Sequence, residues 1–217
     1  MSSSSWRWRK FCRLFFHMDE CLEWKNSEFC LDCKNPCVRN AVCCVAQIQK
    51  QDRTVIRWYR NRSLSDLRTV HAEEWFFSDP EWKNLDKEEI TLYLTFQPCH
   101  QNTDRSCVEL ILAWKKLHPN VKLTIKCTGL YRAHWTEKTL YESDNDYKHY
   151  SPKAESARQG IRALLVTPNI TLQSMTKLDW TNLISWHGLQ PNELAADVWA
   201  LRSQYDQQIQ SFLEQHK

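Results

Sequence analysis

The chain has 217 residues, of which 42% are hydrophobic and 25% are charged, and its formal net charge is +3. This length and apolar content predict one globular domain with at most a small appendage. The sequence has neither a run of 18 apolar residues nor an uninterrupted apolar stretch at its start, so we expect it to contain neither a membrane-spanning helix nor a signal peptide. We therefore expect no membrane partner and an intracellular location, in the cytoplasm, the nucleus or both.

Residues 1–40 are basic and rich in cysteine, and the pattern predicts only a short helix within them, at about 7–18. The next segment predicts a β-hairpin, because two strand-like runs at 41–50 and 54–60 are separated by a short polar turn. The second run lies in a basic stretch, since five arginines and two acids occur from Asp52 to Arg68. A local basic surface can bind a phosphate backbone, although a solvated charged face gives the same pattern.

After the hairpin, helical and strand patterns alternate along the chain. A helix begins near residue 71, and later helices are predicted at 107–117, 152–165, 177–186 and 191–215. Strands are predicted between them at 90–96, 121–127 and 170–175. This alternation predicts an α/β fold in which helices cover the faces of a mixed sheet. We expect a single domain over residues 41–217, preceded by the Cys-rich segment 1–40.

Residues that bind zinc occur at three predicted element ends. His71 opens a helix, Cys99 follows a strand after Pro98, and Cys107 opens the next helix. One nitrogen and two sulfur ligands leave a fourth position for water, which is the arrangement of a catalytic zinc site. Glu73 is two residues from His71, so the pattern indicates a proton shuttle that does not bind the metal.

The spacing of these residues is close to that of a zinc deaminase, whose signature is His-x-Glu followed by Pro-Cys-x-x-Cys. Here 24 residues separate Glu73 from Pro98, and seven separate Cys99 from Cys107. Ordinary buried thiols at the two cysteines are the alternative. His100 is adjacent to a ligand and is therefore a poor ligand itself, so we expect it to make a loop contact.

At this point the chain resembles the AID/APOBEC cytidine deaminases, from about residue 41 to residue 186. The segment ITLYLTFQPC at 90–99 is similar to the family's strand ending in Ser-Trp-Ser-Pro-Cys, and 107–125 is similar to its metal helix and the strand after it. Leu130-Tyr131 resembles the start of the family's substrate-specificity loop. Arg60-Asn61 resembles the Arg-Asn or His-Asn that precedes its His-x-Glu.

The resemblance implies a cytidine-deaminase-like fold, a five-stranded mixed sheet flanked by about six helices. It implies conversion of cytosine to uracil in single-stranded DNA or RNA, with attack of a zinc-bound hydroxide on C4 of an extruded base. It assigns Zn²⁺ to His71, Cys99 and Cys107, and proton transfer to Glu73. It also implies that Asn61 lies near the target sugar and that Tyr131 lies against the flipped base.

Further substrate contacts are expected around this centre. Arg60 and Arg62 flank Asn61 and should contact phosphates. His134 lies just beyond Tyr131 in a loop whose aromatic and basic residues suit base stacking. Phe96-Gln97 replaces the family's Trp-Ser before Pro98, so an aromatic pocket wall is kept while the group that meets the base edge changes.

Four N-terminal cysteines form a second cluster, namely Cys21, Cys30, Cys33 and Cys37. The spacing of Cys30 and Cys33 is that of a zinc knuckle, and the other two could complete four thiolates. Disulfides and plain thiols are the alternatives.

Two other functions are compatible with the sequence. One is deamination of a free nucleoside, against which the basic hairpin and the aromatic loop argue. The other is a catalytically silent nucleic-acid-binding or regulatory module, because a fold alone does not fix an activity. The oligomeric state is left open.

Overall fold

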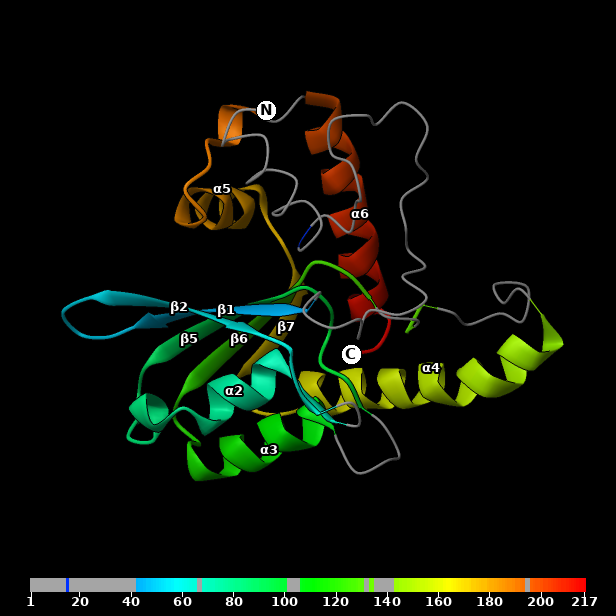
Figure 1. The fold of residues 1–217 in the computed structure, drawn as a ribbon, viewed down its shortest axis with the longest axis horizontal. Coiled ribbons are helices and arrows are strands. Elements are labelled where there is room, and N and C mark those ends of the chain that lie inside the picture. The colour runs from blue at the N-terminus through cyan, green and yellow to red at the C-terminus, as the bar shows by residue number, and fades with distance from the viewer. Residues whose placement is uncertain are drawn as a thin grey trace.

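The computed structural model describes residues 15, 42–65, 68–100, 106–130, 133–134, 143–193 and 196–217. Its centre is a five-stranded sheet in the order β2-β1-β5-β6-β7 (Figure 1). The strands are β1 (Cys43–Gln49), β2 (Thr54–Arg60), β5 (Glu89–Leu94), β6 (Lys122–Cys127) and β7 (Ile170–Ser174). β1 is antiparallel to both β2 and β5, whereas β5, β6 and β7 are parallel to one another. The predicted five-stranded mixed sheet is confirmed.

A second, two-stranded sheet was not expected from the sequence. It consists of β3 (Arg62–Ser65) and β4 (Arg68–Val70), which are antiparallel with a register shift between Ser63 and Ser65. This hairpin joins the end of β2 to His71. The serine-rich sequence of this segment has the composition of a loop, which is why the pattern did not indicate strands.

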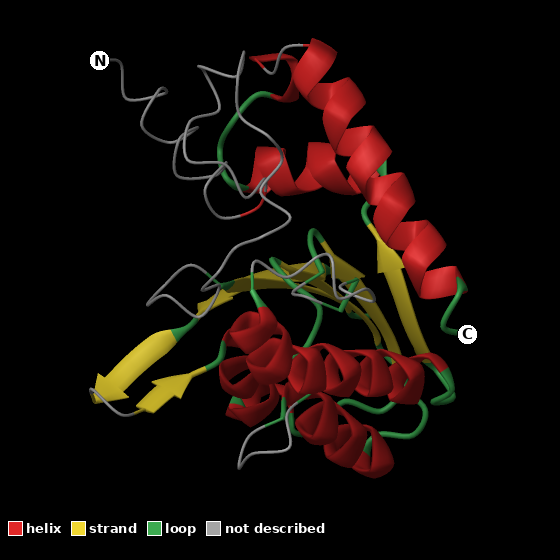
Figure 2. Ribbon diagram, turned by 90° about the vertical axis from the view of Figure 1, so that its right-hand side faces the viewer, coloured by secondary structure: helices red, strands yellow, loops and turns green. Residues whose placement is uncertain are grey.

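Helices cover both faces of the five-stranded sheet. α2 (Ala72–Ser78), α3 (Cys107–Leu117) and α4 (Asp144–Leu165) lie on one face, and α5 (Lys177–Trp186) and α6 (Ala196–Glu214) lie on the other (Figures 1 and 2). The described residues therefore contain five α-helices, where about six were expected. The expected helix at 7–18 lies outside the described residues except for Phe15.

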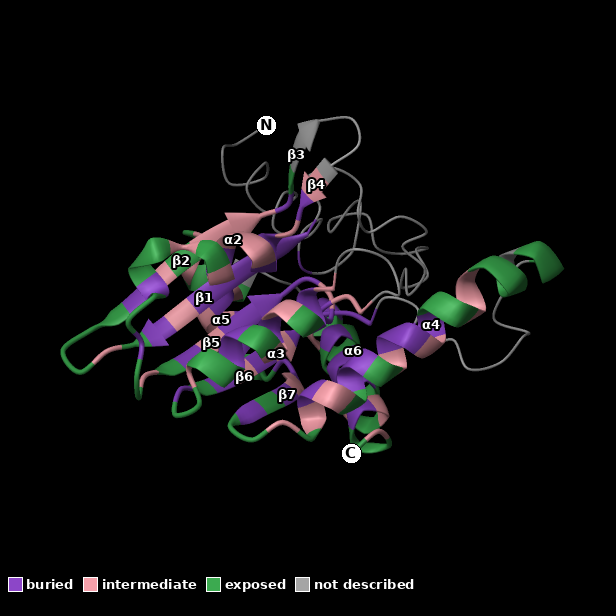
Figure 3. Ribbon diagram, turned by 90° about the horizontal axis from the view of Figure 1, so that it is seen from below, coloured by how far each residue is buried: buried purple, intermediate pink, exposed green. Residues whose placement is uncertain are grey.

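The bounds of α3 and α5 are those predicted, while α4 and α6 differ from expectation. α4 begins at Asp144, eight residues before the expected start at Pro152, which lies inside the helix. Its first turns project from the body of the molecule and are largely exposed (Figure 3). α6 begins at Ala196, after a short 3₁₀ turn at Pro191–Glu193.

The core is divided between the two faces of the sheet. Along β1, alternate side chains point to opposite faces. Ala46 belongs to the cluster that includes Phe76 of α2 and Ile111 of α3. Val45 belongs to a second cluster with Trp180 of α5 and Phe15. Burial on both faces agrees with the apolar run that opens β1, where Cys43, Cys44, Val45 and Ala46 are all buried. No helix among the described residues is both long and apolar enough to cross a bilayer.

Candidate metal centre

The three expected ligands come together at one end of the sheet, where α2 and α3 begin. His71 precedes α2, Cys99 follows β5, and Cys107 is the first residue of α3. Their ligand atoms all lie within 4.8 Å of one another. His71 Nδ1 is 3.2 Å from Cys107 Sγ and 3.4 Å from Cys99 Sγ. Among the described residues, this is the group of histidine, cysteine and acidic side chains that could hold a metal ion.

The donor set and its dimensions fit zinc. Zinc bound tetrahedrally by histidine nitrogen and cysteine sulfur keeps these atoms about 3.6 Å apart, since the bonds are about 2.0 and 2.3 Å long. The observed nitrogen-to-sulfur distances are only slightly shorter. Cys107 is buried and the other two residues are partly accessible, so the centre is reached from one side. Two thiolates and one imidazole are a favoured ligand set for this metal, and three protein ligands leave one position for water.

Without metal, the hydrogen bonds among the three candidate ligands shift their pKa values in opposite directions. The hydrogen bond from Cys107 and the neighbouring His71 lower the pKa of Cys99 to about 4, against the opposing effect of burial. The hydrogen bond with Cys99 raises the pKa of His71 to about 9 despite its burial. The pair is therefore a thiolate and an imidazolium at neutral pH. A metal ion that binds here displaces protons from His71 and Cys107.

Glu73 is buried beside these ligands. Its Oε2 atom has no hydrogen-bond partner within the described part of the chain, and the residue is 4% exposed. Burial, and then the Cys99 thiolate, raise the pKa of Glu73 to about 7. A carboxyl group with this pKa can both take and give a proton near neutral pH, as a general acid and base must.

The start of α2 is fixed by two side chains. Glu74 Oε2 accepts a hydrogen bond from the backbone N–H of His71 over 2.7 Å. Asn61 Oδ1 accepts one from the backbone N–H of Ala72 over 2.8 Å. Asn61 is 1% exposed and lies where β2 ends. These bonds satisfy N–H groups that have no partner within the helix, and they fix the helix turn that carries His71 and Glu73.

Cys99 and Cys107 lie close together in space although seven residues separate them in the sequence. The carbonyl oxygen of Cys99 accepts a hydrogen bond from the backbone N–H of Val108 over 3.1 Å. Ser106 caps α3 by accepting from the backbone N–H of Glu109 over 3.1 Å. The two ends of the interval are thus joined beside the ligands. Residues 101–105 themselves lie outside the described residues.

The other predicted site residues vary in position. Phe96 is half-buried, while Gln97 is buried and its backbone N–H donates to Gly129. Arg60 is half-buried and Arg62 is exposed. His134 is half-buried and lines a groove of about 550 Å³ against α6. Tyr131 and the four cysteines Cys21, Cys30, Cys33 and Cys37 lie outside the described residues, so their expected roles stay predictions.

Sequence reasoning missed two features of the site. Trp75 on α2 lies under Arg62, whose guanidinium is 5.6 Å from the centre of a Trp75 ring. His100, expected to contact a loop, instead binds Ser156 of α4. Its position beside Cys99 was the signal in the sequence, but its partner is 56 residues away and no local pattern indicates it.

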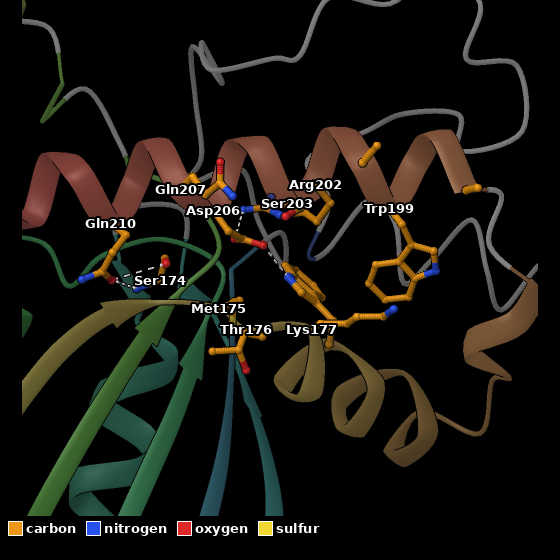
Figure 4. Close-up of a pocket in the computed structure, with 13 residues that line it drawn as sticks. Ser174, Met175, Thr176, Lys177, Trp199, Arg202, Ser203, Asp206, Gln207 and Gln210 are labelled. Atoms are coloured by element: carbon orange, nitrogen blue, oxygen red, sulfur yellow. Dashed lines mark hydrogen bonds and ion pairs between the residues drawn. The ribbon is translucent and has the colours of Figure 1, made fainter.

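A separate cavity lies on the opposite face of the sheet. It measures about 500 Å³ and lies between α5 and α6 (Figure 4). Asp206 there accepts hydrogen bonds from Arg202 and from the indole N–H of Trp180. The guanidinium of Arg202 also lies over the rings of Trp180 and Tyr205. This cavity contains none of the candidate metal ligands.

Comparison with protein families decides how this centre is classified. The model of the APOBEC3 cytosine deaminase domain matches residues 23–149, which include His71, Glu73, Cys99 and Cys107. This chain belongs to that family. The candidate metal ligands lie within the part of the chain that the family model matches, and the resemblance to AID/APOBEC deaminases is confirmed. A comparison with curated protein sequences gave no match.

Solved structures of one other deaminase also align with this APOBEC3-type chain. The Rib2 deaminase of Aspergillus oryzae, as a C-terminal deletion mutant at pH 6.5, is 14% identical, with a TM-score of 0.35. That alignment covers 74% of this chain and 88% of the other. A complex of the same mutant enzyme with DARIPP is 13% identical, with a TM-score of 0.36, and the alignment covers 90% and 99%.

Proposed function

We propose that this chain is a zinc-dependent cytidine deaminase that converts cytosine to uracil in single-stranded DNA or RNA. One observation carries the proposal. Three zinc-binding side chains converge beside a buried carboxyl group whose Oε2 atom has no partner among the described residues. A carboxylate that merely stabilised the fold would have both oxygens hydrogen-bonded or exposed, because burying an unpaired polar atom is costly. Membership of a cytosine deaminase family supports cytosine as the base.

The residues of the centre divide the chemistry between them. His71, Cys99 and Cys107 would hold zinc, which supplies a nucleophile near neutral pH by lowering the pKa of a bound water. Glu73 takes a proton from the attacking water and returns one to the departing amino group at C4. Cytosine and water thereby give uracil and ammonia. The raised pKa of Glu73 suits both proton transfers.

The groups around the centre support a polynucleotide substrate. Arg60 and Arg62 flank Asn61, and Asn61 binds the turn of α2 that carries the first ligand. A phosphate held by these arginines would therefore be close to a base at the candidate metal centre. Arg62 is exposed and lies over an indole ring, an arrangement that can also contact an unpaired nucleotide.

The test uses full-length protein and an oligonucleotide with a single cytosine. Uracil formation is measured by mass on single-stranded DNA, on single-stranded RNA, on the matching duplex and on free cytidine. Glu73→Gln serves as the matched control, because it keeps the shape of the side chain but cannot shuttle the proton. We expect turnover on a single strand and a loss of about 10²- to 10⁴-fold in the variant.

The same experiment separates the competing functions. Turnover of cytidine alone would indicate a free-nucleoside deaminase. Binding of single strands without turnover, by protein that contains zinc, would indicate a silent nucleic-acid-binding module. Equal turnover by wild type and Glu73→Gln would overturn the mechanism whatever the substrate.

A further inference from the structure

His100 and Ser156 are joined by hydrogen bonds that run in both directions. His100 Nδ1 lies 2.9 Å from the carbonyl oxygen of Ser156, and Ser156 Oγ donates to the carbonyl oxygen of His100 over 2.8 Å. Because a carbonyl oxygen can only accept, Nδ1 carries the proton. Ser156 is 3% exposed. The two bonds therefore fix both the side chain and the backbone of His100 against α4.

Gly160, one turn further along α4, allows this close approach. A Cβ atom at Gly160 would lie 2.4 Å from the Cβ of His100 and 3.0 Å from Cγ2 of Val108. The first of these distances is far inside van der Waals contact. The segment after Cys99 thus rests directly on the backbone of α4, and Val108 of α3 meets it at the same point.

His100 consequently connects three parts of the centre. Its neighbour Cys99 accepts hydrogen bonds at its carbonyl oxygen from the backbone of Val108 and, over 3.4 Å, from Ser106 Oγ. These bonds hold together the start of α3, the segment that follows β5 and the middle of α4, beside Cys99 and Cys107. The chain between them can then vary in length, since a longer loop between fixed ends adds little entropic cost.

We propose that His100 and Ser156 are positioning residues that hold Cys99 and Cys107 at zinc-binding distance across their seven-residue interval. In the two-residue signature of zinc deaminases, the short interval itself limits the separation of the cysteines. Here the bonds to α4 replace that restraint. This inference rests on the proposed zinc site, but it concerns residues that touch neither the metal nor a substrate.

The experiment measures zinc affinity of the full chain by competition with a chromophoric chelator. His71→Ala gives the baseline for zinc bound elsewhere in the protein. His100→Ala is expected to weaken binding at the centre by about 10- to 100-fold, the usual effect of losing a group that orients a ligand. Ser156→Ala removes the contacts made by Oγ but keeps the bond from His100 Nδ1 to the carbonyl oxygen of residue 156, so it should have a smaller effect in the same direction.

Two further variants separate positioning from general stability. His100→Asn keeps an N–H donor near the position of Nδ1 and should restore most of the affinity lost in His100→Ala. Glu109→Gln changes only the contact on the other side of the ring, where His100 Nε2 and Glu109 Oε1 are 3.4 Å apart. It should bind zinc as wild type does.

Each outcome bears on one of the two claims. If wild type binds no more zinc than His71→Ala, the proposed zinc site is wrong. If wild type exceeds that baseline but His100→Ala and Ser156→Ala equal wild type, the positioning role is wrong. It is also wrong if affinity falls only in proportion to the unfolded fraction seen by circular dichroism, or if His100→Asn is as weak as His100→Ala.

Discussion

The side-chain oxygen of Asn61 caps the helix that begins at Ala72, so the end of β2 fixes the turn that carries His71 and Glu73. Asn61→Ala should destabilise the protein by about 1 kcal/mol, the usual cost of losing a helix cap. Asn61→Asp keeps the accepting oxygen and should retain most of that stability, as measured by urea unfolding. A fall in turnover for Asn61→Asp at normal stability would indicate that the amide N–H₂ contacts substrate. Unchanged turnover would limit Asn61 to its structural role.

Removal of any one ligand should remove the zinc of this centre. His71→Ala, Cys99→Ser and Cys107→Ser are each expected to lower zinc content to the same extent, because the ligand group found among the described residues contains only these three. Cys127→Ala is the matched control, since Cys127 is equally buried but lies on β6, away from the ligand group. Zinc per chain is measured by elemental analysis after dialysis. Full zinc content and activity in Cys107→Ser would show that another residue is the third ligand.

The burial of Glu73 should make metal-free protein less stable as pH rises. Its pKa in the folded state is about 7, above the ordinary 4.5, so folding favours the protonated form. This stabilising effect is present below pH 4.5 and is lost as pH rises to about 7. The glutamine of Glu73→Gln does not titrate. The free energy of unfolding of this variant should therefore exceed that of wild type by about 3 kcal/mol at pH 8, and by only about 1 kcal/mol at pH 5. Urea unfolding with a chelator and a reductant measures the difference, and a pH-independent difference would contradict it.

The ion pair between Arg202 and Asp206 should contribute to the stability of the fold but not to zinc binding. Both residues are buried, at 1% and 6% exposure. Asp206→Ala leaves the Arg202 charge uncompensated, which typically costs about 3–5 kcal/mol. Glu89→Gln, which breaks an exposed ion pair with Lys122, should produce no measurable change in urea unfolding. Normal stability of Asp206→Ala would mean that the stacking of Arg202 on aromatic rings suffices.

Arg60 and Arg62 should contribute to binding in a different way from Tyr131. Replacing both arginines with glutamine should weaken binding to all single strands and reduce the slope of log K against log salt by about 1.4, or about 0.7 for each phosphate contact. Tyr131→Ala should instead lower turnover and alter the preference for the base 5′ to the target, because a stacking contact is lost. Fluorescence anisotropy over a salt series measures the first effect. No change in either variant would favour a free-nucleoside substrate.

The parts of the fold that follow from local periodicity could be predicted from the sequence. Strict alternation of apolar and polar residues at 121–127 predicted β6. The spacing of apolar residues at 107–117 predicted α3 with its observed bounds. The start of α4 was wrong because Pro152 is typical of a first helical turn, yet the helix continues through it from Asp144.

The residues of the candidate centre also include some that could be predicted from the sequence and some that could not. His71, Glu73, Cys99 and Cys107 could be named because their chemistry requires particular residue types at particular element ends. The interaction of His100 with Ser156 could not be predicted, because it depends on the packing of α4 and on the missing side chain of Gly160. Trp75 was missed for a similar reason, since an aromatic residue on an amphipathic helix usually belongs to the core.

The arginines of β2 should also affect how readily copies of this protein aggregate. Among the described strands, β2 pairs only with β1 and forms one edge of the sheet, so its outer backbone groups could accept a strand from a second molecule. Arg57 on this strand is exposed, and positive charge on an edge discourages such pairing. A variant designed to abolish polynucleotide binding by neutralising this strand would also lose protection against aggregation. Replacing the arginines with lysines would keep that protection, whereas replacing them with apolar residues would not.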